Sequence, residues 1–193
     1  MRKVSSLIFS PRKAGWLYGC LAFFWGCSAP ENVALERAFD LPAFFQAEQK
    51  RLESTPVQVL KTVEVNSRSA AYTTDSIRWT EELALPASLD LNKPAWIGKY
   101  RQERISTQNG TIVRYLPIDE SIPLRFAEIR LLADGRVHSA EGYRTESSLI
   151  TETSVHWWYY PDSLYRIMGT ERLRGLQPNR YSVEGRLAGK GSR

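Results

Sequence analysis

Short extended segments separated by turn-forming residues fill the chain from Trp96 onward. The Asn-Gly pair at 109–110 and the Asp-Gly pair at 134–135 each lie between two such segments, and both tolerate the positive φ angles of tight hairpin turns. Further breaks follow at 161–162 and 176–179, where proline interrupts the pattern. Because no apolar pattern of helical length lies between the segments, consecutive strands are expected to pair antiparallel.

The part of the chain before these hairpins mixes helical and extended patterns. An Asp-Leu-Pro start at 40–42 and apolar residues three and four apart predict an amphipathic helix that ends at 54–56. Residues 57–65 alternate with period two and predict a strand, in which Lys61 interrupts the buried series and suggests an edge position or a bulge. A Ser- and Ala-rich turn follows, and then a short helical segment at 76–85. The sequence therefore predicts an α+β fold, with N-terminal helices packed on a curved, meandering antiparallel sheet of seven or eight strands.

The N-terminal leader combines positive charge, an apolar block and a cysteine. The apolar block at 14–26 is shorter than the roughly 20 residues that a membrane-spanning helix needs. Gly26 and Cys27 end it, and this order resembles the signal peptide and lipobox of bacterial lipoproteins. The resemblance implies that Cys27 carries a lipid such as palmitate and that the protein is anchored in the cell envelope, in the outer membrane rather than the inner membrane. Cys20 as the lipidated residue, an uncleaved anchor helix and ordinary secretory cleavage near Ala29 are the alternatives.

The predicted organisation follows from this leader. It comprises a signal peptide at 1–26, a tether at 27–38, a single α+β domain at 39–188 and a disordered tail at 189–193. With the leader removed and Cys27 lipidated, no thiol is left for a disulfide, a zinc site or a nucleophile.

The net charge of the chain depends largely on the leader. The sequence has 26 Lys and Arg against 21 Asp and Glu, a formal net charge of +5, and four of the basic residues lie in the leader without any acid. The remaining charges nearly balance and are scattered singly. The chain therefore lacks the basic surface of a nucleic-acid-binding protein, and no nucleic-acid partner is expected.

The run His-Trp-Trp-Tyr-Tyr at 156–160 is the strongest candidate for a binding surface. In a strand, Trp157 and Tyr159 face one side while Trp158 and Tyr160 face the other, so both faces carry aromatic surface. One set can join the core under the helices, whereas the other needs cover from a loop, a partner or a ligand. We name all four as candidate ligand- or partner-binding residues, and the sequence leaves open which pair is buried. Three tyrosines on neighbouring strands can extend this surface: Tyr115, Tyr143 and Tyr165.

Residue spacings typical of catalysis, cofactor binding or metal binding are weak in this chain. His138 and His156 could act as bases, or could ligate a metal together with Glu141 or Glu152. Histidines on separate strands are more commonly packed or hydrogen-bonded without a catalytic role. We therefore predict a non-enzymatic protein without a metal or other cofactor.

The order of elements resembles that of half-barrel carriers of the LolA and LolB type, which hold acyl chains on such a sheet. The leader and the size of the domain resemble small uncharacterised lipoproteins of Bacteroidota. Two roles follow as hypotheses: a lipid-anchored envelope protein that holds an apolar or glycan ligand on its sheet, or an accessory subunit that docks onto another envelope protein through the aromatic surface. A deep cavity beneath the sheet would favour the first role, and a flat exposed patch would favour the second.

Overall fold

A computed structural model describes residues 37–188 of the protein. The predicted signal peptide, Cys27, most of the tether and the tail at 189–193 lie outside the described residues. Within 37–188, the helices are too short or too polar to cross a membrane.

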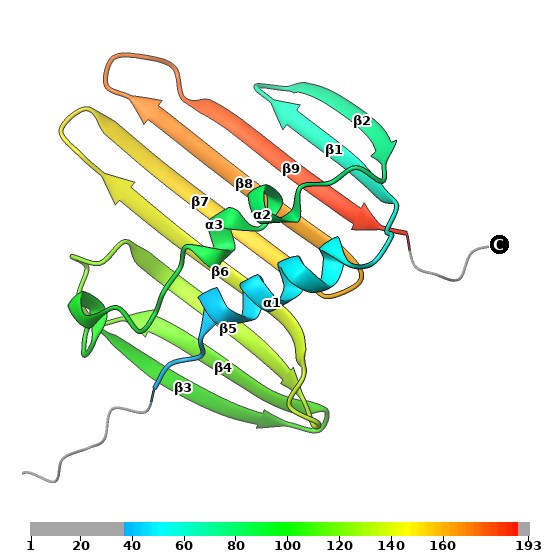
Figure 1. Ribbon diagram of the computed structural model, residues 1–193. Coiled ribbons are helices and arrows are strands. Elements are labelled where there is room, and N and C mark those ends of the chain that lie inside the picture. Colours follow the sequence, from blue (N-terminus) through cyan, green and yellow to red (C-terminus); the bar gives the residue numbers. More distant parts are fainter. Residues whose placement is uncertain (1–36, 189–193) are drawn as a thin grey trace, which may run out of the picture. The chain divides into compact units, whose positions relative to one another are not determined.

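The described part of the chain forms one antiparallel sheet of nine strands and three α-helices (Figure 1). The helical elements are α1 (Leu41–Glu53), α2 (Trp79–Glu82), α3 (Ala84–Ala87) and the 3-10 turn η1 (Pro94–Trp96). The strands are β1 (Val59–Val65), β2 (Arg68–Thr74), β3 (Tyr100–Thr107), β4 (Gly110–Pro117), β5 (Leu124–Leu132), β6 (Val137–Ser147), β7 (Thr151–Tyr160), β8 (Leu164–Leu173) and β9 (Asn179–Leu187).

The strand order is β2-β1-β9-β8-β7-β6-β5-β4-β3. From β3 to β9, consecutive strands are neighbours, which confirms the predicted meander. The β1–β2 hairpin extends the sheet beyond β9, because β1 pairs with β9. The segment that holds α2 and α3 then crosses one face of the sheet and leads to β3 at the opposite edge (Figure 1).

The sheet has nine strands, so the prediction of seven or eight was wrong. The extra strand is β2, in the segment interpreted as a Ser- and Ala-rich turn. The turn itself is only two residues long, since Asn66 and Ser67 adopt positive φ angles of 47° and 68° between the two strands. Six of the seven β2 residues are exposed, so no alternation of polar and apolar residues marked the strand.

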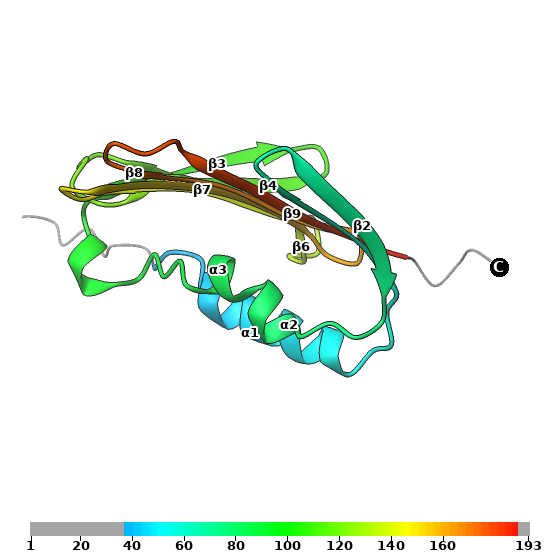
Figure 2. The ribbon, with the colours of Figure 1, turned by 90° about the horizontal axis from the view of Figure 1, so that it is seen from above.

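All three helices lie against the same face of the sheet (Figure 2). The side chain of Asp40 caps α1 by accepting a hydrogen bond from the backbone of Ala43. Leu41, Phe45 and Leu52 of α1 are at most 1% exposed and join the core on this face. We call it the covered face, and the opposite one, over which no helix or strand of residues 37–188 lies, the open face (Figure 2).

Lys61 lies on the covered face and not at an edge of the sheet, because β1 is flanked by β2 and β9. Its ammonium group pairs with Glu82 of α2, and both side chains are 16% exposed. Tyr165 of β8 also donates a hydrogen bond to Glu82, at 2.9 Å. The lysine that interrupts the apolar series of β1 therefore holds the crossing segment onto the sheet.

Candidate functional site

The aromatic run lies in β7, and its residues divide between the two faces of the sheet. Trp157 and Tyr159 are 2% and 1% exposed on the covered face. Phe45 of α1 packs edge-on against both rings, with centroids 5.5 and 5.3 Å apart. Trp158 and Tyr160 lie on the open face, where Tyr160 is 37% exposed at the strand end. Of the four candidate residues, Trp158 and Tyr160 are therefore the two that lie on the open face.

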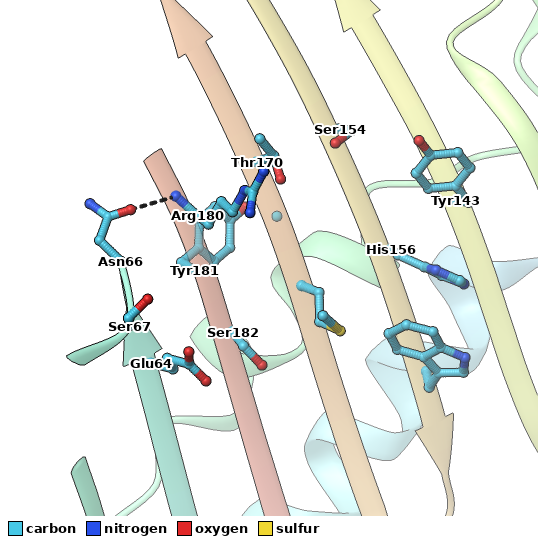
Figure 3. A pocket seen from close by; sticks show the side chains of 13 residues that line it. Glu64, Asn66, Ser67, Tyr143, Ser154, His156, Thr170, Arg180, Tyr181 and Ser182 are labelled. Atoms are coloured by element: carbon cyan, nitrogen blue, oxygen red, sulfur yellow. Dashed lines mark hydrogen bonds between the residues drawn. The ribbon is translucent and has the colours of Figure 1, made fainter. Parts of the chain in front are cut away.

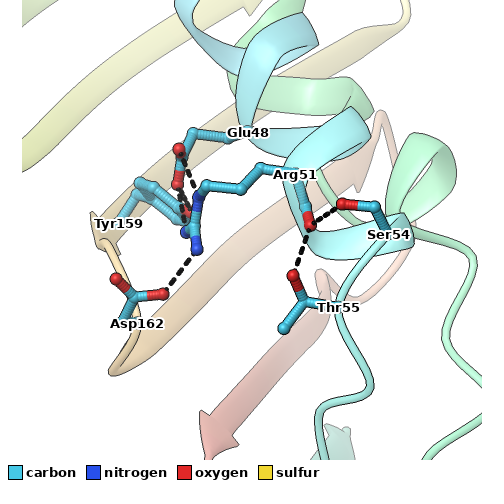
Figure 4. A network of polar contacts seen from close by, with 6 residues as sticks. All are labelled: Glu48, Arg51, Ser54, Thr55, Tyr159 and Asp162. Atoms are coloured by element: carbon cyan, nitrogen blue, oxygen red, sulfur yellow. Dashed lines mark hydrogen bonds and ion pairs between the residues drawn. The ribbon is translucent and has the colours of Figure 1, made fainter.

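A polar network fixes the covered half of the run to α1 (Figure 4). Tyr159 donates a hydrogen bond to Glu48, and Arg51 forms two hydrogen bonds with the same carboxylate. Arg51 also pairs with Asp162 in the turn after β7, at 2.7 Å. Burial and the Glu48 carboxylate both raise the pKa of the Tyr159 phenol, so this hydroxyl stays protonated and acts as a donor. The network therefore holds α1 against the covered face of the sheet.

The three tyrosines expected to extend the aromatic surface also divide between the faces. Tyr115 and Tyr165 are each 1% exposed in the core of the covered face. Tyr143 is half-buried on the open face, opposite His156 in the register of β6 and β7.

Four rings from β5, β6 and β7 form a contiguous aromatic cluster on the open face, which we call the aromatic cluster: Phe126, Tyr143, His156 and Trp158. The rings of His156 and Trp158 have centroids 3.7 Å apart and planes inclined by 31°, so the imidazole lies over the indole. Phe126 and Tyr143 contact the same imidazole, with centroids 5.5 and 5.4 Å away. His156 is thus the central ring of the cluster.

Glu141 fixes the position of His156, because its carboxylate lies 2.7 Å from Nε2 of the imidazole. Both side chains are 29% exposed. His138 lies elsewhere and is exposed, and Glu152 pairs with Arg172. No group of three potential metal ligands occurs among the described residues, and within them no hydroxyl is hydrogen-bonded to His156. The histidine therefore has an orienting carboxylate but no adjacent nucleophile in this part of the chain.

Ion-pair clusters flank the aromatic cluster on the open face. Glu128 accepts hydrogen bonds from Arg114 and Arg130 at 2.7 to 2.9 Å. Burial opposes ionisation of Glu128, but the two guanidinium groups outweigh it and lower the pKa of the carboxyl group below its ordinary value. A matching cluster on the other side has a carboxylate with a lowered pKa and two cations: Glu184, Arg166 and Arg186.

A groove of about 490 Å³ lies on the open face beside the aromatic cluster (Figure 3). Tyr143, His156 and Trp158 form one wall. Residues of β1 and of the β1–β2 turn form the opposite wall: Glu64, Asn66 and Ser67. The floor between the walls comes from β7, β8 and β9 and contains Ser154, Met168, Thr170 and Ser182, with Arg180 beside it.

The groove and a second hollow differ in whether their polar groups have partners. A hollow of about 540 Å³ lies beside α1, but its Arg51, Glu48 and Asp162 side chains are paired with one another. In the groove, the hydroxyls of the floor and the Glu64 and Arg180 side chains have no hydrogen-bond or ion-pair partner within residues 37–188. These unpartnered groups make the groove the stronger candidate for a binding site.

Comparisons with known proteins add little to this geometry. No family model matches the chain, and no curated protein matches it in sequence. Among solved structures, the chain is similar to an S-type phycobiliprotein lyase from Guillardia theta, with 10% sequence identity and a TM-score of 0.25. The match covers 85% of this chain and 100% of that chain. A similarity at this level carries no argument about function.

The polar half of the groove had no signal in the sequence. Ser154, Thr170 and Ser182 are single hydroxyl residues in three different strands, and only the register of those strands brings them together. The alternation of β7 predicted that Trp157 and Trp158 lie on opposite faces of the sheet. It did not show which of the two faces the helices.

Proposed function

We propose that this protein is a lipid-anchored, non-enzymatic component of the bacterial cell envelope that binds a ligand in the groove on its open face. The observation that supports binding is the contrast in pairing across that face. Ion pairs hold the charged groups around Glu128 and Glu184, whereas the hydroxyls and charges of the groove have no partner among the described residues. A ligand can hydrogen-bond to such groups in exchange for water, without breaking any hydrogen bond or ion pair within the described part of the protein.

The helix-covered side of the sheet offers less support for a carrier role. The largest side chains buried there are Trp157, Tyr115, Tyr159 and Tyr165, each at most 2% exposed. These rings fill the place in which a carrier of acyl chains would hold its ligand. The proposed binding site is therefore the groove on the open face and not a cavity beneath the helices.

The anchor is proposed from the leader, with a lipid on Cys27 as the attachment to the membrane and the outer membrane as the favoured location. Cys27→Ser should abolish incorporation of labelled palmitate and release the protein from the membrane fraction, because the thioether needs the cysteine sulfur. Cys20→Ser is the matched control and should leave labelling unchanged. Labelling that survives Cys27→Ser but not Cys20→Ser would move the lipid to Cys20.

The groove can be tested in cells without knowledge of the ligand. A photoreactive phenylalanine analogue placed at Met168 lies on the groove floor, and the same analogue at Tyr72 of β2 is a control of similar exposure, since the native residues are 45% and 49% exposed. Irradiation should give an adduct from position 168 and none from position 72. If neither position gives an adduct in intact cells, the proposed binding function fails.

A role as an accessory subunit of an envelope complex is the second candidate. The observation that favours it lies at the hairpin ends and not in the aromatic run. Leu149 is 90% exposed, and Ile150 and Leu176 are each 65% exposed. They lie at two hairpin ends that are joined by a hydrogen bond from the backbone of Arg174 to that of Ile150, and exposed apolar side chains that gather in one place are typical of docking surfaces. The photoreactive analogue at Leu149 should yield a protein-sized adduct if this surface docks onto a partner, and no such adduct if it does not.

A further inference from the structure

We propose that the groove binds a saccharide, specifically a short uncharged glycan chain that lies between its aromatic and polar walls. This inference rests on the proposed binding function and names the chemical class of the ligand. It follows from the different chemistry of the two walls, from the hydroxyls of the floor and from the charge balance of the groove.

The aromatic wall provides a preformed surface for the apolar face of a sugar ring. Trp158 is stacked on His156, and His156 is held by Glu141 at 2.7 Å. Tyr143 continues the wall onto β6, and no hydrogen bond involves its hydroxyl within residues 37–188. A pyranose ring has one face made mainly of C–H groups, and aromatic side chains bind such a face through their large apolar surface. Because neighbouring side chains already fix the rings, little conformational entropy is lost on binding.

The polar wall is also held in place before any ligand binds. The side-chain oxygen of Asn66 accepts a hydrogen bond from the backbone N–H of Arg180, and its amide nitrogen donates one to Asn179 at 2.7 Å. These contacts fix the β1–β2 turn to the start of β9 (Figure 3). Glu64 and Ser67 can then offer a carboxylate and a hydroxyl from a fixed position across the groove from the rings.

The floor excludes an acyl chain as the favoured ligand. Ser154 lies opposite Thr170 on adjacent strands, and Ser182 lies opposite Met168. An acyl chain laid over the three hydroxyls would remove them from water without giving them a partner, which costs free energy for each group. The hydroxyl groups of a sugar can both donate to and accept from these side chains.

The charges of the groove favour an uncharged ligand. Glu64 and Arg180 carry one charge of each sign, and His156 is already paired with Glu141. A phosphate-rich or strongly basic ligand would therefore meet one unfavourable charge for each favourable one. The volume of about 490 Å³ lies in the range of small-ligand sites, about 300–1,000 Å³, and suits a short chain in an open groove.

The inference can be tested with the full-length lipidated protein in nanodiscs. Saturation-transfer NMR and calorimetry would measure binding of three probes: an N-acetylglucosamine tetramer, a glucose tetramer and palmitate. We expect at least one of the tetramers to bind and palmitate not to compete. Trp158→Ala should weaken sugar binding by about tenfold or more, since aromatic side chains dominate such interfaces. Thr170→Val, which removes a hydroxyl at nearly constant volume, should weaken it by about threefold to tenfold.

Tyr160→Ala is the matched control, because Tyr160 is an aromatic residue on the same strand and face but outside the groove. It should leave sugar binding unchanged, and circular dichroism should show that all three variants are folded. Palmitate partitions into the lipid of the nanodisc, so its binding counts only where Trp158→Ala abolishes it. Such palmitate binding without binding of either sugar would overturn the saccharide class and leave the binding function intact. The same conclusion would follow if neither class bound while the Met168 adduct persisted in cells. Sugar binding that Trp158→Ala and Thr170→Val leave unchanged would overturn the assignment to this groove. Loss of the Met168 adduct together with all binding would reject the proposed function itself.

Discussion

Trp157 and Trp158 are neighbours in the sequence, yet Trp157 is 2% exposed beneath α1, whereas Trp158 is half-buried beside His156 on the open face. The same alternation runs through β8, where Tyr165 is buried under α2 and Arg166 pairs with Glu184 on the open face. One set of strands thus builds two surfaces of different chemistry. Apolar burial holds the covered face together, while stacked rings and ion pairs organise the open face. The groove on that face lies between the aromatic cluster and the β1–β2 turn.

The largest expected effect comes from the two adjacent tryptophans. Trp157→Ala should lower the free energy of unfolding by about 3–5 kcal/mol, because it empties a site packed against Phe45 and Gly142. Trp158→Ala should lower it by less than about 1.5 kcal/mol, since the indole is only half-buried on the open face, where it stacks on His156. Urea denaturation at neutral pH would measure both values.

Equal losses of unfolding free energy in Trp157→Ala and Trp158→Ala would contradict the difference between the two faces. If both were severely destabilised, the aromatic cluster would be a second core, and the groove beside it would lose its main wall as a binding surface. Trp157→Phe keeps a ring at the buried position and should recover part of the stability lost in Trp157→Ala, which separates loss of packing from a failure to fold.

A second test uses two positions of β9 that point to opposite faces. A Cβ at Gly185 would lie 2.1 Å from Cε1 of Tyr165, a distance that real Cβ atoms do not show. Gly185→Ala should therefore cost about 1–3 kcal/mol, because the Tyr165 ring and its hydrogen bond to Glu82 must shift. Ser182→Ala on the open face of the same strand should change stability by no more than about 0.5 kcal/mol. Thermal unfolding would measure both effects. If Gly185→Ala left the unfolding temperature unchanged, the covered face would be loosely packed.

Much of the fold could be predicted from the sequence, because turn chemistry and alternation are local. The Asn-Gly and Asp-Gly pairs lie between β3 and β4 and between β5 and β6, as expected. The capped start of α1 at Asp40 is also confirmed. β2 was missed because its side chains are mostly exposed and leave no alternating pattern. Lys61 suggested an edge because its partner Glu82, from the crossing helix, is distant in sequence.

The candidate site was less predictable than the fold. The alternation of β7 fixed which aromatic residues share a face, but the phase of that strand relative to the helices depends on contacts such as that of Phe45 with Trp157. The groove depends further on the register of β1, β9 and β8, which brings Glu64, Ser182 and Met168 into one row across the sheet. Single residues in separate strands leave no sequence pattern that predicts such a row.

The smallest expected effect concerns the ion pairs of the open face. Hydrogen bonds from Arg114 and Arg130 lower the pKa of Glu128 in the folded protein below the value of about 4.3 that glutamate has in an unfolded chain. The ionised carboxylate therefore adds stability that is fully present above that unfolded-state pKa and is lost as the pH falls through the lower folded-state pKa. Glu128→Gln should cost about 1 kcal/mol at pH 7 and progressively less below about pH 4. Urea midpoints measured across this pH range would test the prediction.

Glu64→Gln is the matched control, because Glu64 is on the same face and has no ion-pair partner among the described residues. It should change the free energy of unfolding at pH 7 by no more than about 0.5 kcal/mol. If Glu128→Gln lowered the free energy of unfolding by the same amount at every pH, Glu128 would stabilise the protein through its packing and not through its charge. The open face would then be stabilised by packing, as the covered face is. The two faces would differ only in that helices lie against one of them.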